Sequence, residues 1–223
     1  MPRIRRSSLP TNVSPADDDF TNGTCRYDGG PPGDREIRSA LLTLLREAHP
    51  DDAAVALLEE LGLCRGEVFV DVTLVNGSLH GYEIKSDRDS LRRLAHQVAV
   101  YSAVLDRATL VVGERHVEDA VELIPAWWQV LVAHVTPASL VFSELRPGAV
   151  NERRQPRALV ELLWLDEAVA LLAVRNAARG FRRKPRPVVW DRVCEVYDLD
   201  EIAAEVRERL KARPARLVAR SRG

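Results

Sequence analysis

Two runs rich in β-forming residues, 67–75 and 78–85, flank the pair Asn76-Gly77. This dipeptide is among the strongest short signals of a β-hairpin, because both residues tolerate the backbone angles that tight hairpin turns require. The flanking residues are largely apolar, which favours strands in the middle of a sheet over an exposed edge. We therefore expect the fold to be organised around a central hairpin.

The length of the hairpin loop decides which side chains share a face of the sheet. Side chains alternate along a strand, so Glu83 and Lys85, two residues apart, share one face. A three-residue loop centred on Gly77 places Asp71 opposite Glu83, whereas a two-residue loop turns Glu83 to the other face. We expect the three-residue loop, with Gly77 near the left-handed region, or a bulge with the same effect.

Asp71, Glu83 and Lys85 form a candidate catalytic centre. Two carboxylates that face each other at about 5 Å across a sheet repel unless a cation lies between them. Carboxylate oxygens are hard ligands that suit Mg²⁺ or Mn²⁺. Beside such a metal, Lys85 would orient an attacking water or stabilise the charge that develops on a phosphate. The pattern therefore favours metal-dependent phosphodiester hydrolysis.

An acid–apolar–lysine triplet is common on exposed strands, and three features strengthen the catalytic interpretation. Lysine is rare, with three lysines against 29 arginines. A lysine at position 85 is therefore less easily explained as an arbitrary choice of basic residue. The strands around the triplet are apolar, as central strands are. Gln97 and Tyr101, four residues apart, share one face of the helix expected after the hairpin.

The spacing of six positions resembles the PD-(D/E)xK nuclease superfamily, in its RecB-like branch with a Gln-x-x-x-Tyr helix: Gly66, Asp71, Glu83, Lys85, Gln97 and Tyr101. The resemblance covers about residues 34–145 and implies an α/β, restriction-endonuclease-like mixed sheet flanked by helices. Segments 80–101, 124–128 and 162–164 look more narrowly like an uncharacterised bacterial family within this superfamily. The superfamily's proline before the aspartate is Val70 here, as in many members.

The resemblance also implies a role for each residue of the centre. Asp71, Glu83 and the main-chain carbonyl of Ile84 would hold Mg²⁺ or Mn²⁺, and Lys85 would assist the water. The implied activity is a metal-dependent nuclease, with DNA as the expected substrate.

Supporting residues are implied in the same way. Gln97 and Tyr101 would position substrate or support the site. An acid on the first helix often completes the centre in this superfamily. By position Glu36 is the best match, with Glu47 and Glu60 as alternatives.

The chain is expected to divide into a disordered tail (1–33), a nuclease-like domain (34–146) and a helical basic subdomain (147–223). Residues 53–63 are ambiguous between helix and strand, and we favour a strand. Trp127 and Trp128 are interpreted as packing residues on a strand. The remaining elements are expected as helices at 36–50 (capped by Asp34), 89–105, 116–124, 157–178, 188–196 and 199–212, and strands at 108–113, 127–135 and 139–145.

Charge is unevenly distributed along the chain. Residues 1–145 carry 14 lysines and arginines against 22 acids, whereas residues 146–223 carry 18 against 11. A basic half suits phosphate contact. We interpret one segment of this half as nucleic-acid-binding, on six cations without an acid: Arg175, Arg179, Arg182, Arg183, Lys184 and Arg186. Arg92 and Arg93, near the candidate centre, fit phosphate contact and plain solvation equally.

Three widely spaced cysteines, Cys25, Cys64 and Cys194, and no apolar segment of membrane-spanning length favour a cytoplasmic protein without membrane contact. The alternative function is a non-catalytic DNA-binding protein that keeps the nuclease fold and uses its basic C-terminal helices. A nucleotide- or protein-binding regulator is a third possibility, although the sequence has no phosphate-cradling Gly-rich loop.

Overall fold

The computed structural model describes residues 32–50, 54–136 and 139–213. The expected disordered tail lies outside these residues except for Pro32 and Gly33, and Cys25 lies outside them as well. The described residues belong to one compact unit. The proposed boundary at residue 146 stays a prediction.

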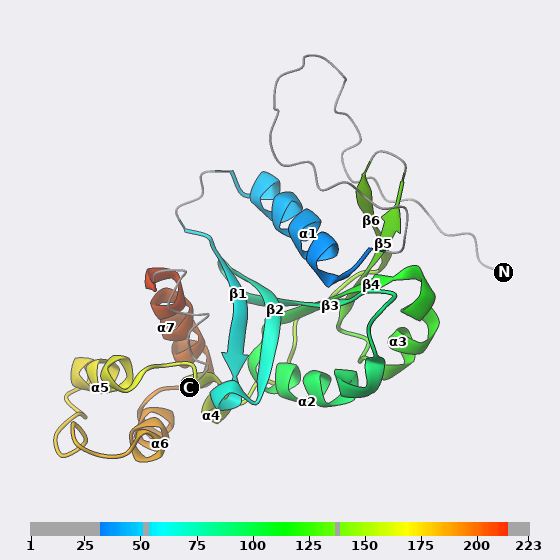
Figure 1. Cartoon of the computed structure of the whole chain (residues 1–223). Helices are drawn as coiled ribbons and strands as arrows, with labels where there is room; N and C mark the ends of the chain where they lie inside the picture. The colour runs from blue at the N-terminus through cyan, green and yellow to red at the C-terminus, as the bar shows by residue number, and fades with distance from the viewer. Residues whose placement is uncertain (1–31, 51–53, 137–138, 214–223) are drawn as a thin grey trace. The chain divides into compact units, whose positions relative to one another are not determined.

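A six-stranded mixed sheet forms the centre of the fold, in the order β1-β2-β3-β4-β5-β6 (Figure 1). The β3–β4 and β4–β5 pairs are parallel and the other neighbouring pairs are antiparallel. The expected α/β class with a mixed sheet is thus confirmed, and so is the strand favoured for residues 53–63. The strands are β1 (Ala56–Leu63), β2 (Val68–Val75), β3 (Leu79–Lys85), β4 (Arg107–Gly113), β5 (Gln129–Val135) and β6 (Leu140–Arg146).

The hairpin of β2 and β3 has the expected three-residue loop, residues 76–78. Val75 pairs with Leu79, and the same register continues to Val72 and Tyr82. The expectation for Gly77 was wrong, because the described glycines with a positive φ are Gly66 and Gly180. The turn is closed instead by the side chain of Asn76, whose Oδ1 accepts from the Ser78 N–H at 2.9 Å. A side-chain bond of this kind takes the place of a left-handed residue.

Helix α1 (Asp34–Ala48) covers one face of the sheet (Figure 1). Its apolar residues recur three or four positions apart, so they form one stripe that packs on the strands. The stripe and the strand residues make one buried cluster: Ile37, Leu41, Leu42, Leu45, Val72, Leu74, Tyr82, Ile84, Val111 and Ala133. The expected cap at Asp34 was wrong by one residue. Gly33 is the cap, and its N–H donates to Glu36 Oε2 at 3.0 Å.

The opposite face of the sheet carries α2 (Leu94–Val104) and α3 (Val117–Leu123). A 3-10 turn, Leu91–Arg93, precedes α2, so the helix begins later than residue 89. Trp127 and Trp128 lie before β5 rather than on it, which corrects their placement on a strand. Trp128 is fully buried and stacks on Tyr101 with ring centroids 5.5 Å apart, so its packing role is confirmed.

The C-terminal part is helical, as expected, but the helix expected over 157–178 is two helices. The helices described in this part, up to residue 213, are α4 (Pro156–Val160), α5 (Leu165–Val174), α6 (Arg186–Val196) and α7 (Leu199–Ala212). The break falls at Leu162 and Leu163, both buried, before Trp164 caps α5 in an extended conformation. An apolar run that is buried on several sides shows no helical period, which is why the sequence pattern ran across the break.

One buried acid, Asp106, joins the C-terminal part to the sheet. Its Oδ1 contacts Arg154 at 2.5 Å, and its Oδ2 contacts Arg207 of α7 at 3.2 Å. The Oδ2 atom also accepts from the Leu79 N–H at 2.6 Å. Its side chain is 11% exposed, so the two arginines neutralise a charge that water barely reaches.

None of the described helices is both long and apolar enough to cross a lipid bilayer. The two described cysteines, Cys64 and Cys194, are free thiols.

Candidate metal and nucleic-acid site

The candidate centre lies where the β2–β3 pairing ends. The paired register stops at Val72 and Tyr82, and its continuation would place Asp71 opposite Glu83. At that point a side chain takes over the role of hydrogen-bond acceptor from the main chain of β2: Asp71 Oδ2 accepts from the Ile84 N–H at 2.8 Å. Val70 packs in the core on the α2 side, whereas Val72 packs in the core on the α1 side. The strand therefore changes face at Asp71, whose side chain contacts Arg38 of α1 and the main chain of β3.

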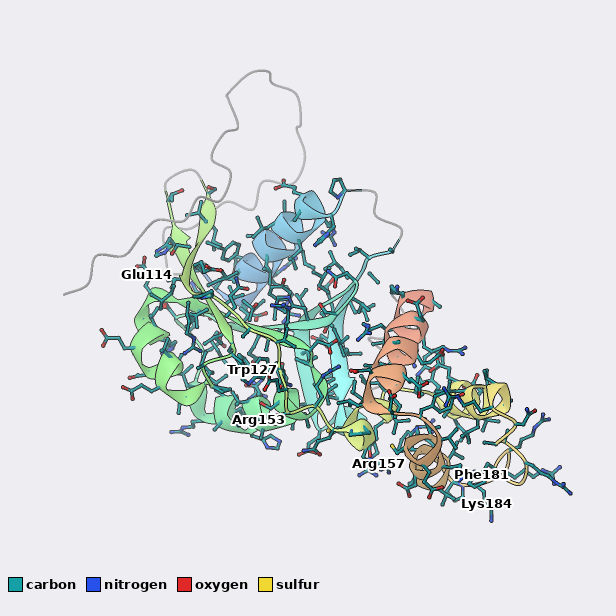
Figure 2. The ribbon with its side chains drawn as sticks, turned by 180° about the vertical axis from the view of Figure 1, so that it is seen from behind. Glu114, Trp127, Arg153, Arg157, Phe181 and Lys184 are labelled. Atoms are coloured by element: carbon teal, nitrogen blue, oxygen red, sulfur yellow. The ribbon has the colours of Figure 1, made fainter. Side chains whose placement is uncertain are left out.

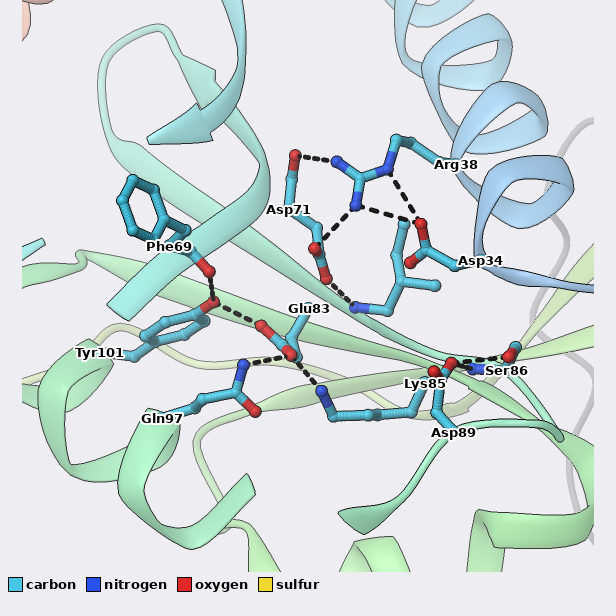
Figure 3. Close-up of polar contacts among 11 residues, drawn as sticks. Asp34, Arg38, Phe69, Asp71, Glu83, Lys85, Ser86, Asp89, Gln97 and Tyr101 are labelled. Atoms are coloured by element: carbon cyan, nitrogen blue, oxygen red, sulfur yellow. Dashed lines mark hydrogen bonds and ion pairs between the residues drawn. The ribbon is translucent and has the colours of Figure 1, made fainter. Parts of the chain in front are cut away.

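Asp71 is held from α1 by Arg38 (Figure 3). Arg38 Nη2 contacts Asp71 Oδ1 at 2.8 Å, and its Nη1 donates to the Asp71 carbonyl at 3.0 Å. Burial raises the pKa of Asp71 from 3.8 to about 7, and the nearby charge of Glu83 adds to the increase. Burial by itself lowers the pKa of Arg38, but the combined attraction of the Asp71 and Asp34 carboxylates is the larger effect, so the pKa of Arg38 is raised.

Glu83 is the most enclosed acid of the centre, with a side chain 2% exposed. Its Oε1 accepts from Lys85 Nζ and from Gln97 Nε2, and its Oε2 accepts from the Tyr101 hydroxyl. Burial raises the pKa of Tyr101, and Glu83 raises it further. The tyrosine therefore stays a neutral donor. The spacing of Gln97 and Tyr101 thus brings both side chains onto Glu83, as their shared helix face predicts.

The donor set fits a hard divalent cation in kind, since it offers carboxylates on two neighbouring strands and main-chain oxygens beside them. Gln97 Oε1 is buried and accepts no hydrogen bond from the described residues, so the centre contains one polar oxygen that is still able to accept a hydrogen bond. In the described part of the chain no three acids, histidines or cysteines come close enough together to form a complete metal cage. All four carboxylate oxygens already accept from protein donors.

The acid that α1 brings to the centre is Asp34, not Glu36. Glu36 is exposed and caps the helix through Gly33. Asp34 Oδ2 lies 3.2 Å from Arg38 Nη2, and its charge contributes to the raised pKa of Asp71. In this conformation Glu36 does not reach the centre, and its role in a metal site stays a prediction. The four-residue spacing of Asp34 and Arg38, a typical helix ion pair, was the signal that could have identified both.

The two alternative acids differ in position. Glu47 is exposed near the end of α1. Glu60 lies on β1 between Glu59, which pairs with Val72, and Leu61, which pairs with Val70. Glu60 therefore falls opposite Asp71 in the strand register, with a strained φ of 53°.

The basic residues lie on two separate elements. Arg92 and Arg93 are exposed in the turn before α2. Three exposed cations, Arg182, Arg183 and Lys184, lie between α5 and α6, and Arg186, also exposed, is the first residue of α6. These four make no ion pair with the described residues. Figure 2 shows Lys184 at the outer end of the C-terminal helices, near Phe181.

Arg175, the first of the six cations, is exposed as well but has partners within the protein. It forms an ion pair with Glu201 and lies over the Tyr197 ring, 4.4 Å from its centroid. Several other arginines of the C-terminal part also form ion pairs with acids of this part. Arg157, Arg192 and Arg213 also lie over aromatic rings.

The chain belongs to the family of bacteriophage P4 protein cII, whose model matches residues 33–220. A curated relative is protein cII of Enterobacteria phage P4, which is 26% identical over 140 residues. That match covers 62% of this chain and 52% of the phage protein, so the chain spans about half the length of this relative.

Two solved structures are similar at low scores. A protein of unknown function from Silicibacter pomeroyi, SPO1766, has a TM-score of 0.39 and 24% identity, covering 69% of this chain and 97% of its own. SfsA from Pyrococcus furiosus, solved in complex with Ca²⁺, has a TM-score of 0.32 and 14% identity, covering 51% of this chain and 65% of its own. The resemblance to PD-(D/E)xK nucleases stays a prediction.

Proposed function

We propose that the protein is a metal-dependent nuclease that hydrolyses phosphodiester bonds in DNA. One observation carries the proposal: where the β2–β3 pairing ends, Asp71 lies close enough to Glu83 for their charges to interact, and Lys85 is bonded to Glu83. Burial keeps these charges in a low-dielectric setting, where a cluster of acids needs a cation. A chain whose sheet served only as a scaffold would have no physical need for this cluster.

The surrounding residues hold the two acids in fixed orientations. The Ile84 N–H fixes the Asp71 carboxylate, while Gln97 and Tyr101 fix that of Glu83. Tyr101 is itself locked, because its ring stacks on the buried Trp128. Hydrogen bonds of this kind keep the carboxylates of Asp71 and Glu83 in place when substrate binds.

Asp71, Glu83 and a main-chain carbonyl next to Glu83, that of Ile84, would hold Mg²⁺ or Mn²⁺. Such a cation lowers the pKa of water and neutralises charge on a phosphate. Lys85 provides a cationic donor beside this position. Its side chain is 6% exposed and its ammonium is bonded to Glu83, so it is already oriented before substrate arrives.

Nucleic acid is proposed to bind through the exposed cations of the segment 182–186. A polyanion gains affinity from lysine and arginine contacts with its phosphates. Arg92 and Arg93 are proposed to add phosphate contacts nearer the centre, because the helix that follows them carries Gln97 and Tyr101.

A second function, binding of DNA without cleavage, is favoured by one specific observation. Arg38 and Lys85 neutralise the two acids internally, and every carboxylate oxygen has a protein donor. With both acids neutralised by protein cations, the centre is stable without a metal, as a protein that only binds DNA requires. The exposed basic segment would serve this function equally well.

The two functions are separated by a cleavage assay on linear, circular and single-stranded DNA with Mg²⁺, Mn²⁺ or EDTA. The nuclease proposal predicts cleavage with either metal, none with EDTA, and activity at background for Asp71→Asn and Glu83→Gln. The control Glu47→Gln, which removes an exposed acid from α1, should cleave like the parent. Retarded DNA without cleavage under every condition would establish the binding function instead, and full activity of Glu83→Gln would refute the proposed centre.

A further inference from the structure

The guanidinium of Arg38 lies between two carboxylates of different elements (Figure 3). It contacts Asp34 on its own helix at 3.2 Å and Asp71 on β2 at 2.8 Å, and a third bond reaches the Asp71 carbonyl. The Arg38 side chain is 17% exposed, and those of Asp34 and Asp71 are 42% and 21% exposed. Arg38 therefore occupies a carboxylate-lined position at the edge of the buried centre, within reach of solvent.

A group of acids this close needs a positive charge, and Arg38 supplies it. Asp71 interacts with the charges of both Glu83 and Asp34. Lys85 is bonded to Glu83, which leaves Arg38 as the cation on Asp71. Each ionised carboxylate oxygen has about two acceptor positions, so one guanidinium bond does not saturate Asp71 Oδ1. The obstacle to a metal is thus the charge of Arg38 more than the number of its bonds.

We propose that Arg38 is a built-in competitor of the divalent cation: it neutralises Asp71 in the metal-free protein and must leave this carboxylate when the metal binds. The inference rests on the proposed metal site and adds a residue that controls its affinity. Departure of Arg38 also releases Asp34, the only acid of α1 that the described contacts connect to the centre. The helix acid of the metal-bound form would then be Asp34.

A purely structural role for Arg38 makes the opposite prediction. If Arg38 only fastens α1 to β2, its removal loosens the carboxylates, and metal affinity should fall or stay unchanged. If Arg38 competes with the metal, its removal should increase affinity even though the metal-free protein becomes less stable. The sign of the change in affinity therefore distinguishes the two roles.

The test is calorimetric titration of the full chain with Mn²⁺. Arg38→Gln should bind Mn²⁺ about tenfold more tightly than the parent, because a hydrogen-bonded charge pair no longer has to be broken. Arg38→Lys keeps the charge without the planar fork and should fall between the two. Arg35→Gln removes the same charge from an exposed site on α1 and should bind like the parent. Asp71→Asn defines the heat that comes from other sites.

Thermal unfolding provides a second readout. Without metal, Arg38→Gln should unfold at a lower temperature than the parent, and saturating Mn²⁺ should raise its midpoint by more than it raises that of the parent. Binding at Asp71 that is equal or weaker in Arg38→Gln would overturn the inference and leave the proposed nuclease intact. If neither protein shows Mn²⁺ binding that depends on Asp71, both the inference and the metal site fail.

Discussion

Two aspartates of this protein, Asp106 and Asp71, each bind arginine but differ in how their charge is balanced. Asp106 lies between Arg154 and Arg207, which approach from the chain after the sheet and from α7. Asp71 has one arginine, and its cluster includes two more acids, Asp34 and Glu83. The side chain of Asp106 is 11% exposed and that of Asp71 is 21% exposed.

The difference shows what separates a structural ion cluster from a candidate site. Around Asp106 two arginines face two acids, Asp106 and the exposed Asp200, and the partners join regions that are distant in the sequence, so the cluster stabilises the fold. At Asp71 acids outnumber cations, and the pKa of Asp71 is raised to about 7 by burial and by Glu83. An excess of buried negative charge is unfavourable for folding and favourable for binding a cation.

The largest expected effect on stability belongs to Asp106. Asp106→Ala should lower the free energy of unfolding by about 3–5 kcal/mol, because it leaves two arginines without their buried partner. Chemical denaturation measures this directly. The matched control is Asp200→Ala, since Asp200 contacts the same Arg154 at 3.2 Å but is 87% exposed. Its cost should stay within about 1 kcal/mol, and equal losses in the two variants would show that burial does not govern this cluster.

The second expected effect is a pH dependence that comes from Asp71. Its folded pKa of about 7 lies above the ordinary 3.8, so the folded state holds the proton more tightly than the unfolded state does. This contribution to stability is complete below pH 3.8 and is lost as the pH rises to about 7. The slope is at most about 1.4 kcal/mol per pH unit.

Denaturation of the metal-free parent and of Asp71→Asn across this range isolates the contribution. The parent should lose stability relative to the variant as the pH rises. Parallel curves for the two proteins would mean that the pKa of Asp71 is the same in the folded and unfolded states, and the contrast with an ordinary ion pair would disappear.

The smallest expected effect on stability belongs to the basic segment. Replacing Arg182, Arg183 and Lys184 by alanine should change the free energy of unfolding by about 0.5 kcal/mol or less, because these side chains are exposed. The same variant should bind DNA more weakly and flatten the salt dependence by up to about one unit per lost contact.

Cleavage by this variant at saturating substrate should change much less than binding. A control triple that removes three exposed arginines elsewhere, Arg35, Arg46 and Arg115, should keep the salt slope of the parent. A basic-segment variant that binds like the parent at every salt concentration would reduce this segment to a solvated connector.

Local patterns were sufficient for the sheet and for the contacts around Glu83. Asn76-Gly77 and the apolar alternation beside it predicted the observed register from Val75–Leu79 to Val72–Tyr82, whose continuation would place Asp71 opposite Glu83. The four-residue spacing of Gln97 and Tyr101 predicted that both side chains share a helix face, and both bind Glu83. These features depend on backbone periodicity, which a sequence displays directly.

The contacts of α1 could not be predicted with the same accuracy. The apolar stripe of α1 followed from its periodicity, but which polar side chains of this helix reach the strands did not: Asp34 and Arg38 contact the centre, whereas Glu36 bonds to Gly33. The ion pairs that the basic segment makes within the protein could not be predicted either. Arg175 pairs with Glu201, which lies far along the chain, and such long-range pairing leaves no periodic signal.

The central claim is that Asp71 and Glu83 hold a divalent cation in place of Arg38, and crystals soaked in Mn²⁺ test it most directly. Anomalous diffraction should place the metal between the two carboxylates, with the guanidinium of Arg38 moved away from Asp71. An Asp71 carboxylate still bonded to Arg38, with no anomalous peak beside Glu83 at Mn²⁺ concentrations that saturate the protein in solution, would contradict the account.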